Sequence, residues 1–341
     1  MVQRTGIGAP AHGHVVLASA DSEAFTSLRK RSTSRIERYR LGKEIRQRVP
    51  RNSLGDWVVR TDRPDPVQLI NESHRGRLEW LIPVRVGRMT ASPYGFLRGA
   101  AVVMAEDVAF TVERDGERRI VEDPPLITRV PAAEAEALAA GLDEYLATLA
   151  PHWRRVLGGY TLVDIAHKVV GVGSVGLRAY VALLEGSSPD DVLFLQLKQA
   201  RRSVLAPYVH GESAWHAHQG QRVVEYQQAL QTVSDPLLGW TSFGGHQYYV
   251  RQFRNMKGTV ALDSIDGSAL ADYAAIVGHL LAKGHARTSG ASMIVGYVGR
   301  SDHLDIALAR FARLYADQTE ADHAALVKAA AQGVVPVERG L

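Results

Sequence analysis

Alternating apolar and polar positions predict a small sheet in the second half of this chain. Three runs within 163–198 have the spacing of strands, and two more runs, 240–243 and 248–253, enclose Gly244-Gly245 and predict a hairpin. Between these groups, residues 220–231 have helical spacing. The pattern therefore predicts three strands, a helix and a hairpin, in that order.

Helices are predicted on both sides of these strands. Apolar residues recur three or four positions apart in each, and the helices cover 26–48, 131–149, 269–286, 302–316 and 320–330. The last two are separated because Thr319 and Asp322 resemble a capping box, which marks the start of a helix. Strands and helices together predict an α+β fold.

Glycine and proline interrupt the segment between the basic helix and residue 131. Short helices are predicted at 73–80 and 100–109, and Asp115-Gly116 predicts the turn of a hairpin within 110–125. The chain divides into a basic tail and helix, an N-terminal segment, a hairpin with a connecting helix, a sheet lobe and a helical lobe. These five segments cover 1–48, 49–109, 110–160, 161–257 and 258–335.

The amino-acid composition excludes several classes of protein. The chain has 341 residues, of which 46% are hydrophobic and 22% charged, so it can bury a core. No apolar run reaches the roughly 18–20 residues that cross a bilayer, so no membrane partner is expected. The absence of cysteine excludes disulfides, thiolate metal sites and a cysteine nucleophile, and it fits the cytoplasmic location that we expect.

The net charge of +4 comes largely from arginines and lysines between residues 29 and 51. A basic run of this kind can attract nucleic acid. Binding of nucleic acid bases needs several interleaved aromatic residues, and Tyr39 is the one aromatic residue in this run before Trp57. A solvated basic helix is therefore the favoured interpretation, and nucleic acid is not an expected partner.

The most definite chemical pattern is a glycine-rich turn between the first two predicted strands, with Gly171, Gly173, Ser174 and Gly176. Glycine lets a backbone approach a phosphate closely because it has no Cβ. One interpretation is a dinucleotide-binding loop, which needs a helix after Gly176 and an acidic residue after the next strand. Another is a turn without a ligand. Both stay open beside the one that follows.

The third interpretation is the glycine loop of a phosphotransferase, in which a lysine on the third strand reaches the nucleotide phosphates. Lys198 ends the third predicted strand, on the face that also carries Phe194 and Gln196. Glu225 lies in the middle of the following helix and would orient Lys198. Beyond it, Arg251 and Met256 would line the segment beside the base of ATP or a related nucleotide.

The catalytic half of a phosphotransferase is missing from this pattern. Such an enzyme needs a catalytic aspartate and metal-binding Asn and Asp residues. After the predicted helix 269–286 an arginine, Arg287, stands where that aspartate would be needed, and no Asp-Phe-Gly follows. We therefore identify no catalytic residue, and we do not expect the chain alone to hold magnesium.

Two other groups of residues are candidate sites. Arg85, Arg88 and Arg98 flank a turn rich in glycine and proline, and they could bind a phosphorylated or carboxylate small-molecule substrate or form surface ion pairs. His216 and His218 could chelate a metal, but no third ligand has suitable spacing, and surface histidines are favoured.

Longer signatures in the chain resemble the bacterial domain of unknown function 2252 family. The N-terminal signature comprises residues 49–51, 63–66, 83–85, 88–89, 92–101 and 104–105. The C-terminal signature comprises residues 122–126, the glycine loop 170–176, Lys198, and residues 220–225, 249–252, 256–258, 285–287 and 315–318. Together they cover most of the chain.

That resemblance implies a kinase-related fold with a piece removed. Members of the family usually carry Gly-Asp-x-His-x-x-Asn-Phe-Gly and Phe-Asp-x-Asn-Asp-Phe-Asp segments, which resemble the catalytic loop and metal-binding strand of aminoglycoside-phosphotransferase-like kinases. These segments precede the glycine loop, so the family resembles a circularly permuted kinase. Both are absent here, and the junction at Ala109-Phe110 resembles an internal deletion.

The favoured hypothesis is thus an incomplete protein-kinase-like fold, a small antiparallel sheet lobe with a helical lobe, that binds ATP without catalysis. Whether the chain is an enzyme stays open. It would be an active phosphotransferase if the native protein or a protein partner supplied the missing segment. A further alternative is an interaction module or decayed remnant that binds no nucleotide.

Overall fold

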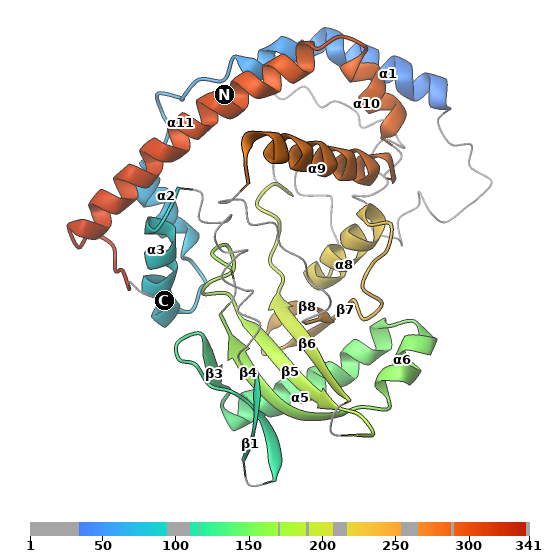
Figure 1. Cartoon of the computed structure of the whole chain (residues 1–341), viewed down its shortest axis with the longest axis vertical. Coiled ribbons are helices and arrows are strands. Elements are labelled where there is room, and N and C mark those ends of the chain that lie inside the picture. Colours follow the sequence, from blue (N-terminus) through green and yellow to red (C-terminus); the bar gives the residue numbers. More distant parts are fainter. Residues whose placement is uncertain are drawn as a thin grey trace.

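The computed structural model describes residues 34–93, 110–114, 116–169, 171–188, 191–206, 217–253, 265–287 and 290–338. These residues form an α+β protein in which a six-stranded antiparallel sheet lies at one end and long helices at the other (Figure 1). The predicted helix 100–109 and the first part of the predicted helix 26–48 lie outside the described residues.

The strands of the main sheet follow the order β3-β4-β5-β6-β8-β7. Their bounds are β3 Ile127–Arg129, β4 Thr161–Lys168, β5 Ala179–Glu185, β6 Val192–Gln199, β7 Gly239–Phe243 and β8 His246–Gln252. The three strands and the hairpin predicted from alternation are confirmed. Strand β6 lies between β5 and β8, so it is a central strand of the sheet.

One face of the sheet packs against helix α5, Ala132–Thr148, which is followed by the short helix α6, Pro151–Leu157 (Figure 1). Leu138 and Tyr145 on α5 join Leu195 and Leu197 of β6 in the largest core cluster. The Tyr145 hydroxyl donates a hydrogen bond of 2.6 Å to the carbonyl of Leu237. The predicted helix 131–149 is confirmed, and its apolar side covers the sheet.

A second core cluster lies on the opposite face, near β3 and the small hairpin. This hairpin consists of β1, Thr111–Arg114, and β2, Glu117–Ile120, as predicted around Gly116. Phe110 meets Phe194 and Phe253 at centroid distances of 5.2 and 5.6 Å. The second face is therefore apolar at this end and polar toward the glycine loop.

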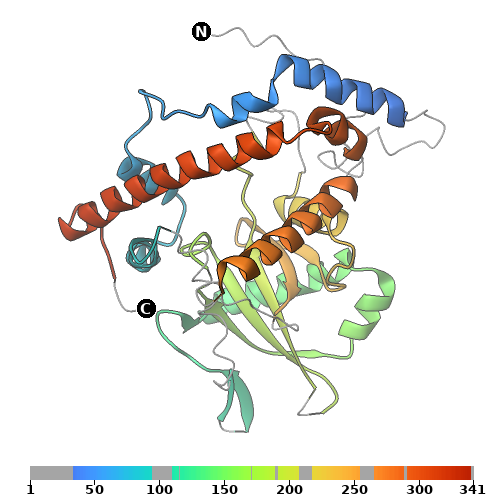
Figure 2. The same cartoon turned by 45° about the horizontal axis from the view of Figure 1, so that its top comes forward.

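Helices from the two ends of the chain lie against each other, as the two views agree (Figures 1 and 2). Helix α1, Arg35–Arg48, begins with a capping box at Ser34 and packs on α10, Ala291–Val298. Gly42 and Gly296 allow this approach, because a Cβ on either would meet a backbone carbonyl oxygen of the other helix.

One prediction for the C-terminal region is wrong. The structure has a single helix α11, His303–Ala331, where two were predicted. The Thr319 hydroxyl donates to the carbonyl of Tyr315 one turn earlier, so this side chain is satisfied inside a helix and caps nothing.

The N-terminal segments pack along α11. They are η2 Arg51–Gly55, α2 Pro66–Ser73 and α3 Ile82–Thr90, and the short η3 Glu79–Leu81 leads directly into α3. The helix predicted at 73–80 is wrong, since α2 ends at Ser73 and only the short η3 begins before Trp80. Asp65 caps α2 instead, accepting from the backbone N–H of Val67 and Gln68.

Two further helices, α8 at Gln219–Leu230 and α9 at Gly267–Arg287, lie between the sheet and the C-terminal helices (Figure 1). Both confirm predicted helices. None of the described helices combines the length and the apolar character that crossing a membrane would require.

Candidate functional site

The glycine loop joins two neighbouring antiparallel strands. Strand β4 ends at Lys168, and β5 begins at Ala179 and pairs with β4. A dinucleotide-binding loop requires a helix immediately after its last glycine. The chain forms a strand there, so the dinucleotide interpretation is wrong.

The loop itself is a compact turn anchored to the N-terminal segment. The backbone N–H of Ser174 donates to the Gly171 carbonyl at 2.8 Å. Val175 is 1% exposed and packs with Leu81 and Val84, while Leu78 N–H donates to the Gly176 carbonyl at 2.7 Å. The apolar side of the loop thus has a structural role of its own.

The glycines of the loop differ in what requires them. Gly176 has φ +84°, and a Cβ placed there would lie 3.0 Å from the Cβ of Arg77, so backbone and packing both demand glycine. A Cβ at Gly171 or Gly173 would meet no atom within 4 Å. Packing against other residues therefore does not explain why these two positions are glycine. The close approach of a ligand would explain it.

This difference predicts opposite results for two matched substitutions. We expect Gly176→Ala to lower the free energy of unfolding by about 1–2 kcal/mol, because alanine is strained at positive φ. We expect Gly173→Ala to leave it unchanged or raise it by up to about 1 kcal/mol, because alanine restricts the unfolded chain. Urea unfolding of both variants measures this, and equal losses would contradict the distinction.

Lys198 occupies the position that the sequence indicated. It lies half-buried in β6, directly opposite Ala179, the first residue after the loop to join a strand, and opposite Tyr249 of β8. Two residues earlier, the amide of Gln196 accepts from Arg251 Nε at 3.2 Å. Residues paired across strands point to the same side of a sheet. Lys198 and Arg251 therefore share the face opposite α5.

Helix α8 rests on this same face. Gln219 at its first position donates its backbone N–H to the Gln247 side chain at 2.8 Å, and His218 contacts Ser242 at 2.9 Å. Gln247 alternates with Tyr249 and Arg251 along β8, so it points to the Lys198 side. Further along α8, Glu225 accepts from Gln221 at 2.8 Å. Helix α8 thus packs on β7 and β8, on the sheet face to which Lys198 of the neighbouring strand β6 points.

Of the three arginines predicted to hold a substrate, Arg85 and Arg88 lie on α3, and Arg98 lies outside the described residues. Burial lowers the pKa of Arg88. Met256 of the predicted nucleotide segment also lies outside the described residues. The structure adds Arg77, whose Nη1 donates to the Val175 carbonyl at 2.5 Å. Sequence spacing gave no sign of this contact.

The predicted surface histidine His218 has a structural role. Its Nδ1 accepts from Gln221 N–H and caps α8, and burial lowers its pKa. Across the ranges that the structure describes, no group of three or more His, Asp or Glu residues has the arrangement of a metal site.

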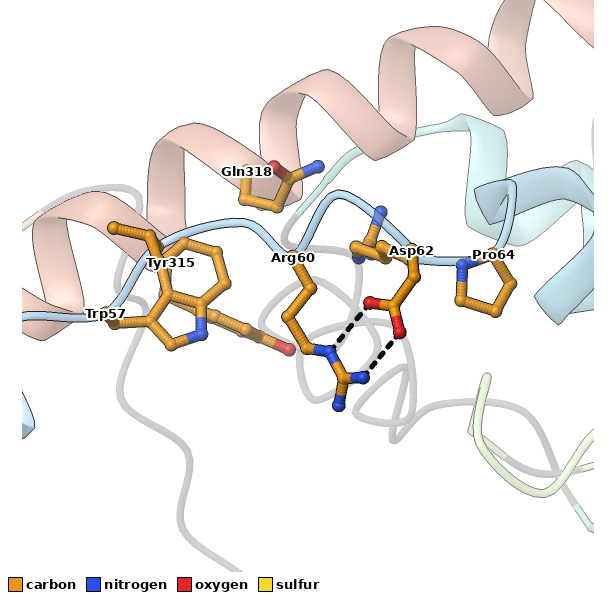
Figure 3. Close-up of a pocket in the computed structure, with 8 residues that line it drawn as sticks. Trp57, Arg60, Asp62, Pro64, Tyr315 and Gln318 are labelled. Atoms are coloured by element: carbon orange, nitrogen blue, oxygen red, sulfur yellow. Dashed lines mark hydrogen bonds and ion pairs between the residues drawn. The ribbon is translucent and has the colours of Figure 1, made fainter. Parts of the chain in front are cut away.

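A pocket of about 420 Å³ lies elsewhere, between the extended segment 57–64 and α11 (Figure 3). Trp57 packs edge-on against Tyr315 at 5.5 Å, and Arg60 makes two hydrogen bonds with Asp62, of 2.8 and 2.6 Å. Arg63 pairs with Asp322 of α11. The charged side chains that line the pocket thus form ion pairs with one another or with Asp322. The packing of segment 57–64 on α11 therefore explains this pocket without a ligand.

Comparison with known protein families gives a match over residues 77–114 and 108–329, which together span most of the chain. The two matched segments overlap at residues 108–114. No curated protein and no solved structure matches the chain. The chain therefore belongs to the family described as an uncharacterized protein conserved in bacteria, DUF2252.

Proposed function

We propose that this protein binds ATP or a related nucleotide on the sheet face that carries Lys198, and that it does not transfer phosphate by itself. The observation that carries this proposal is that Lys198 of β6 points to the sheet face on which α8 packs against β7 and β8, next to a glycine loop that joins β4 to β5. A phosphotransferase needs a glycine loop, a strand lysine and a helix glutamate in this arrangement.

The residues have distinct roles in this proposal. Gly171 and Gly173 leave space for the phosphates, since a side chain there would fill a region that no protein atom occupies within 4 Å. Lys198 contacts the α- and β-phosphates, and Glu225 orients it. Arg251 lies toward the base end of the same face.

An active phosphotransferase is the second candidate. The two family-matched segments overlap at 108–114, and this overlap includes the junction at Ala109-Phe110 where the sequence suggests that a catalytic segment has been lost. If a partner or a longer native product supplies that segment, the nucleotide site would serve catalysis. The mass of the protein in its host shows whether a longer product exists, and co-purification from the host shows whether a partner supplies the segment.

Lys198→Met tests the nucleotide site. We expect it to weaken ATP binding about tenfold or more, which corresponds to roughly 1.4 kcal/mol, because a charge-assisted contact to phosphate is lost. Calorimetric titration of ATP, with and without magnesium, measures this. Lys283→Met on exposed α9 is the charge-matched control and should bind as the wild type does.

Two results would count against the proposal. If the wild type binds no ATP, nucleotide binding is refuted. If Lys198→Met binds ATP as tightly as Lys283→Met, the lysine does not have the role assigned to it, even if a nucleotide binds elsewhere.

A further inference from the structure

Three arginines gather on the α3 side of the glycine loop, although they are distant in sequence. Arg77 lies between α2 and η3, where its Nη1 and Nη2 donate to the carbonyls of Val175 and Gly173. Arg85 lies one turn into α3. Arg201 follows β6, and its Nη2 lies 3.9 Å from where a Cβ of Gly76 would stand. The loop thus has a cationic border.

Arg85 is the unusual member of this group. It is 7% exposed, and neither its Nε nor its Nη1 has a hydrogen-bond partner. Buried donors without partners are costly, so proteins rarely leave them unpaired. Nearby, the Nε2 atom of His74 is also buried and without a partner. Three buried polar atoms here therefore lack a hydrogen-bond partner.

Within the part of the chain that the structure describes, Arg77, Arg85 and Arg201 form no ion pair with an acidic residue. Burial, and next the charge of Arg77, lower the pKa of Arg85 to about 10. Burial and the charge of Arg201 lower the pKa of Arg77. Each guanidinium thus feels another positive charge nearby.

The three side chains differ in exposure in a way that suits a ligand. Arg85 is buried, Arg77 is half-buried and Arg201 is exposed. An anion arriving from solvent would meet Arg201 first and Arg85 last. The planar guanidinium presents parallel donors that match a phosphate better than a point charge does.

We propose that Arg85, together with Arg77 and Arg201, forms a binding site for a phosphate group on the α3 side of the glycine loop. A bound phosphate would accept from the unpartnered Nε and Nη1 of Arg85 and would neutralise the repulsion among the three guanidinium groups. This site does not depend on nucleotide binding at Lys198. The ligand is inorganic phosphate or the phosphate of a small phosphorylated molecule.

Thermal unfolding of the full chain in inorganic phosphate tests the site, with sodium chloride keeping the ionic strength constant. A ligand that binds only the folded state raises the unfolding midpoint with concentration. We expect this rise in the wild type. Arg85→Met should abolish it, yet unfold without phosphate at the wild-type temperature or higher, because an unpaired buried charge is replaced by an apolar side chain of similar length.

A purely structural Arg85 predicts the reverse, namely a lower midpoint for Arg85→Met without phosphate. Arg201→Met gives a second variant whose side chain is exposed, so its folding is not at risk. Calorimetric titration of phosphate into this variant should show about tenfold weaker binding. The exposed Arg155→Met is the charge-matched control and should bind phosphate as the wild type does.

Further experiments distinguish this phosphate site from the nucleotide site at Lys198. Lys198→Met should keep the phosphate-dependent rise even if it loses ATP. Adenosine monophosphate and glucose 6-phosphate in place of phosphate show whether a free or an attached phosphate is preferred. The proposal is overturned if the wild type gains no stability from phosphate, if Arg85→Met keeps the gain, or if acetate at equal ionic strength stabilises equally.

Discussion

Asp164→Ala is expected to lower the free energy of unfolding by about 3 kcal/mol. The Asp164 side chain is 6% exposed and accepts 2.7 Å hydrogen bonds from the backbone N–H of Ile120 and from Arg129 Nη1. Ile120 is fully buried, so its N–H cannot turn to water when the carboxylate is removed. Arg129 is partly exposed, so water can solvate it once the carboxylate is gone. The expected loss of stability is therefore near the lower end of the range for breaking a buried ion pair.

The measurement is urea unfolding of the purified variant against the wild type. Asp62→Ala is the control, because Asp62 also makes a two-bond pair with an arginine, Arg60, but both side chains are mostly exposed. Exposed ion pairs contribute little to stability because water screens them, so we expect Asp62→Ala to unfold almost as the wild type does. Equal losses in the two variants would show that burial of Asp164 does not decide its contribution. Asp164→Asn should lose less than the alanine variant, because it keeps an acceptor for Ile120.

The second large effect is a loss of stability in acid through His167. This ring is 7% exposed, both nitrogens are buried without a partner, and it packs between Trp80 and Tyr180. Burial lowers the pKa of His167 to about 4, although the carboxylate of Glu134 acts in the opposite direction and Arg178 lowers it further. The folded state therefore keeps the ring neutral.

The direction of the change in stability with pH depends on whether the folded or the unfolded state binds the proton. In the unfolded chain the histidine has a pKa near 6.5, so between about pH 6.5 and 4 only the unfolded state is protonated. The free energy of unfolding should fall by about 3 kcal/mol across this window and change no further from this group below pH 4.

Urea unfolding at several pH values measures this dependence in the wild type and in His167→Phe. The phenylalanine variant should lose this part of the slope, while His152→Phe, at an exposed site, should keep it. If the wild type and His167→Phe have the same pH dependence, the ring is not held neutral by burial.

The strands of the sheet could be predicted from the sequence because apolar and polar residues alternate along them, which assigns each side chain to one face of the sheet. Leu195 and Leu197 point to α5, and Gln196 and Lys198 point away, as the period of two requires. Helix α11 shows where local signals fail. A threonine and an aspartate at capping spacing predicted a break, but packing along the N-terminal segments keeps the helix continuous and Thr319 bonds within it.

For the candidate sites too, part could be predicted from the sequence and part could not. The sequence indicated Lys198 and Glu225 by their places on successive elements, and the helix that carries Glu225 packs on β7 and β8, on the sheet face to which Lys198 points. The contact of Arg77 with the glycine loop, and the gathering of Arg201 beside it, have no sequence signature. They depend on how η3 and α3 pack against Val175, and no spacing along the chain encodes that contact.

The sequence by itself determined the α+β class, the order of loop, lysine strand, glutamate helix and hairpin, and membership of the DUF2252 family. These depend on local periodicity and on motifs, both of which are carried by neighbouring residues. Only the tertiary structure decided which glycine is required by its backbone, and which arginine is buried without a partner. Burial and partnership depend on residues from distant segments, so they exist only once the chain has folded.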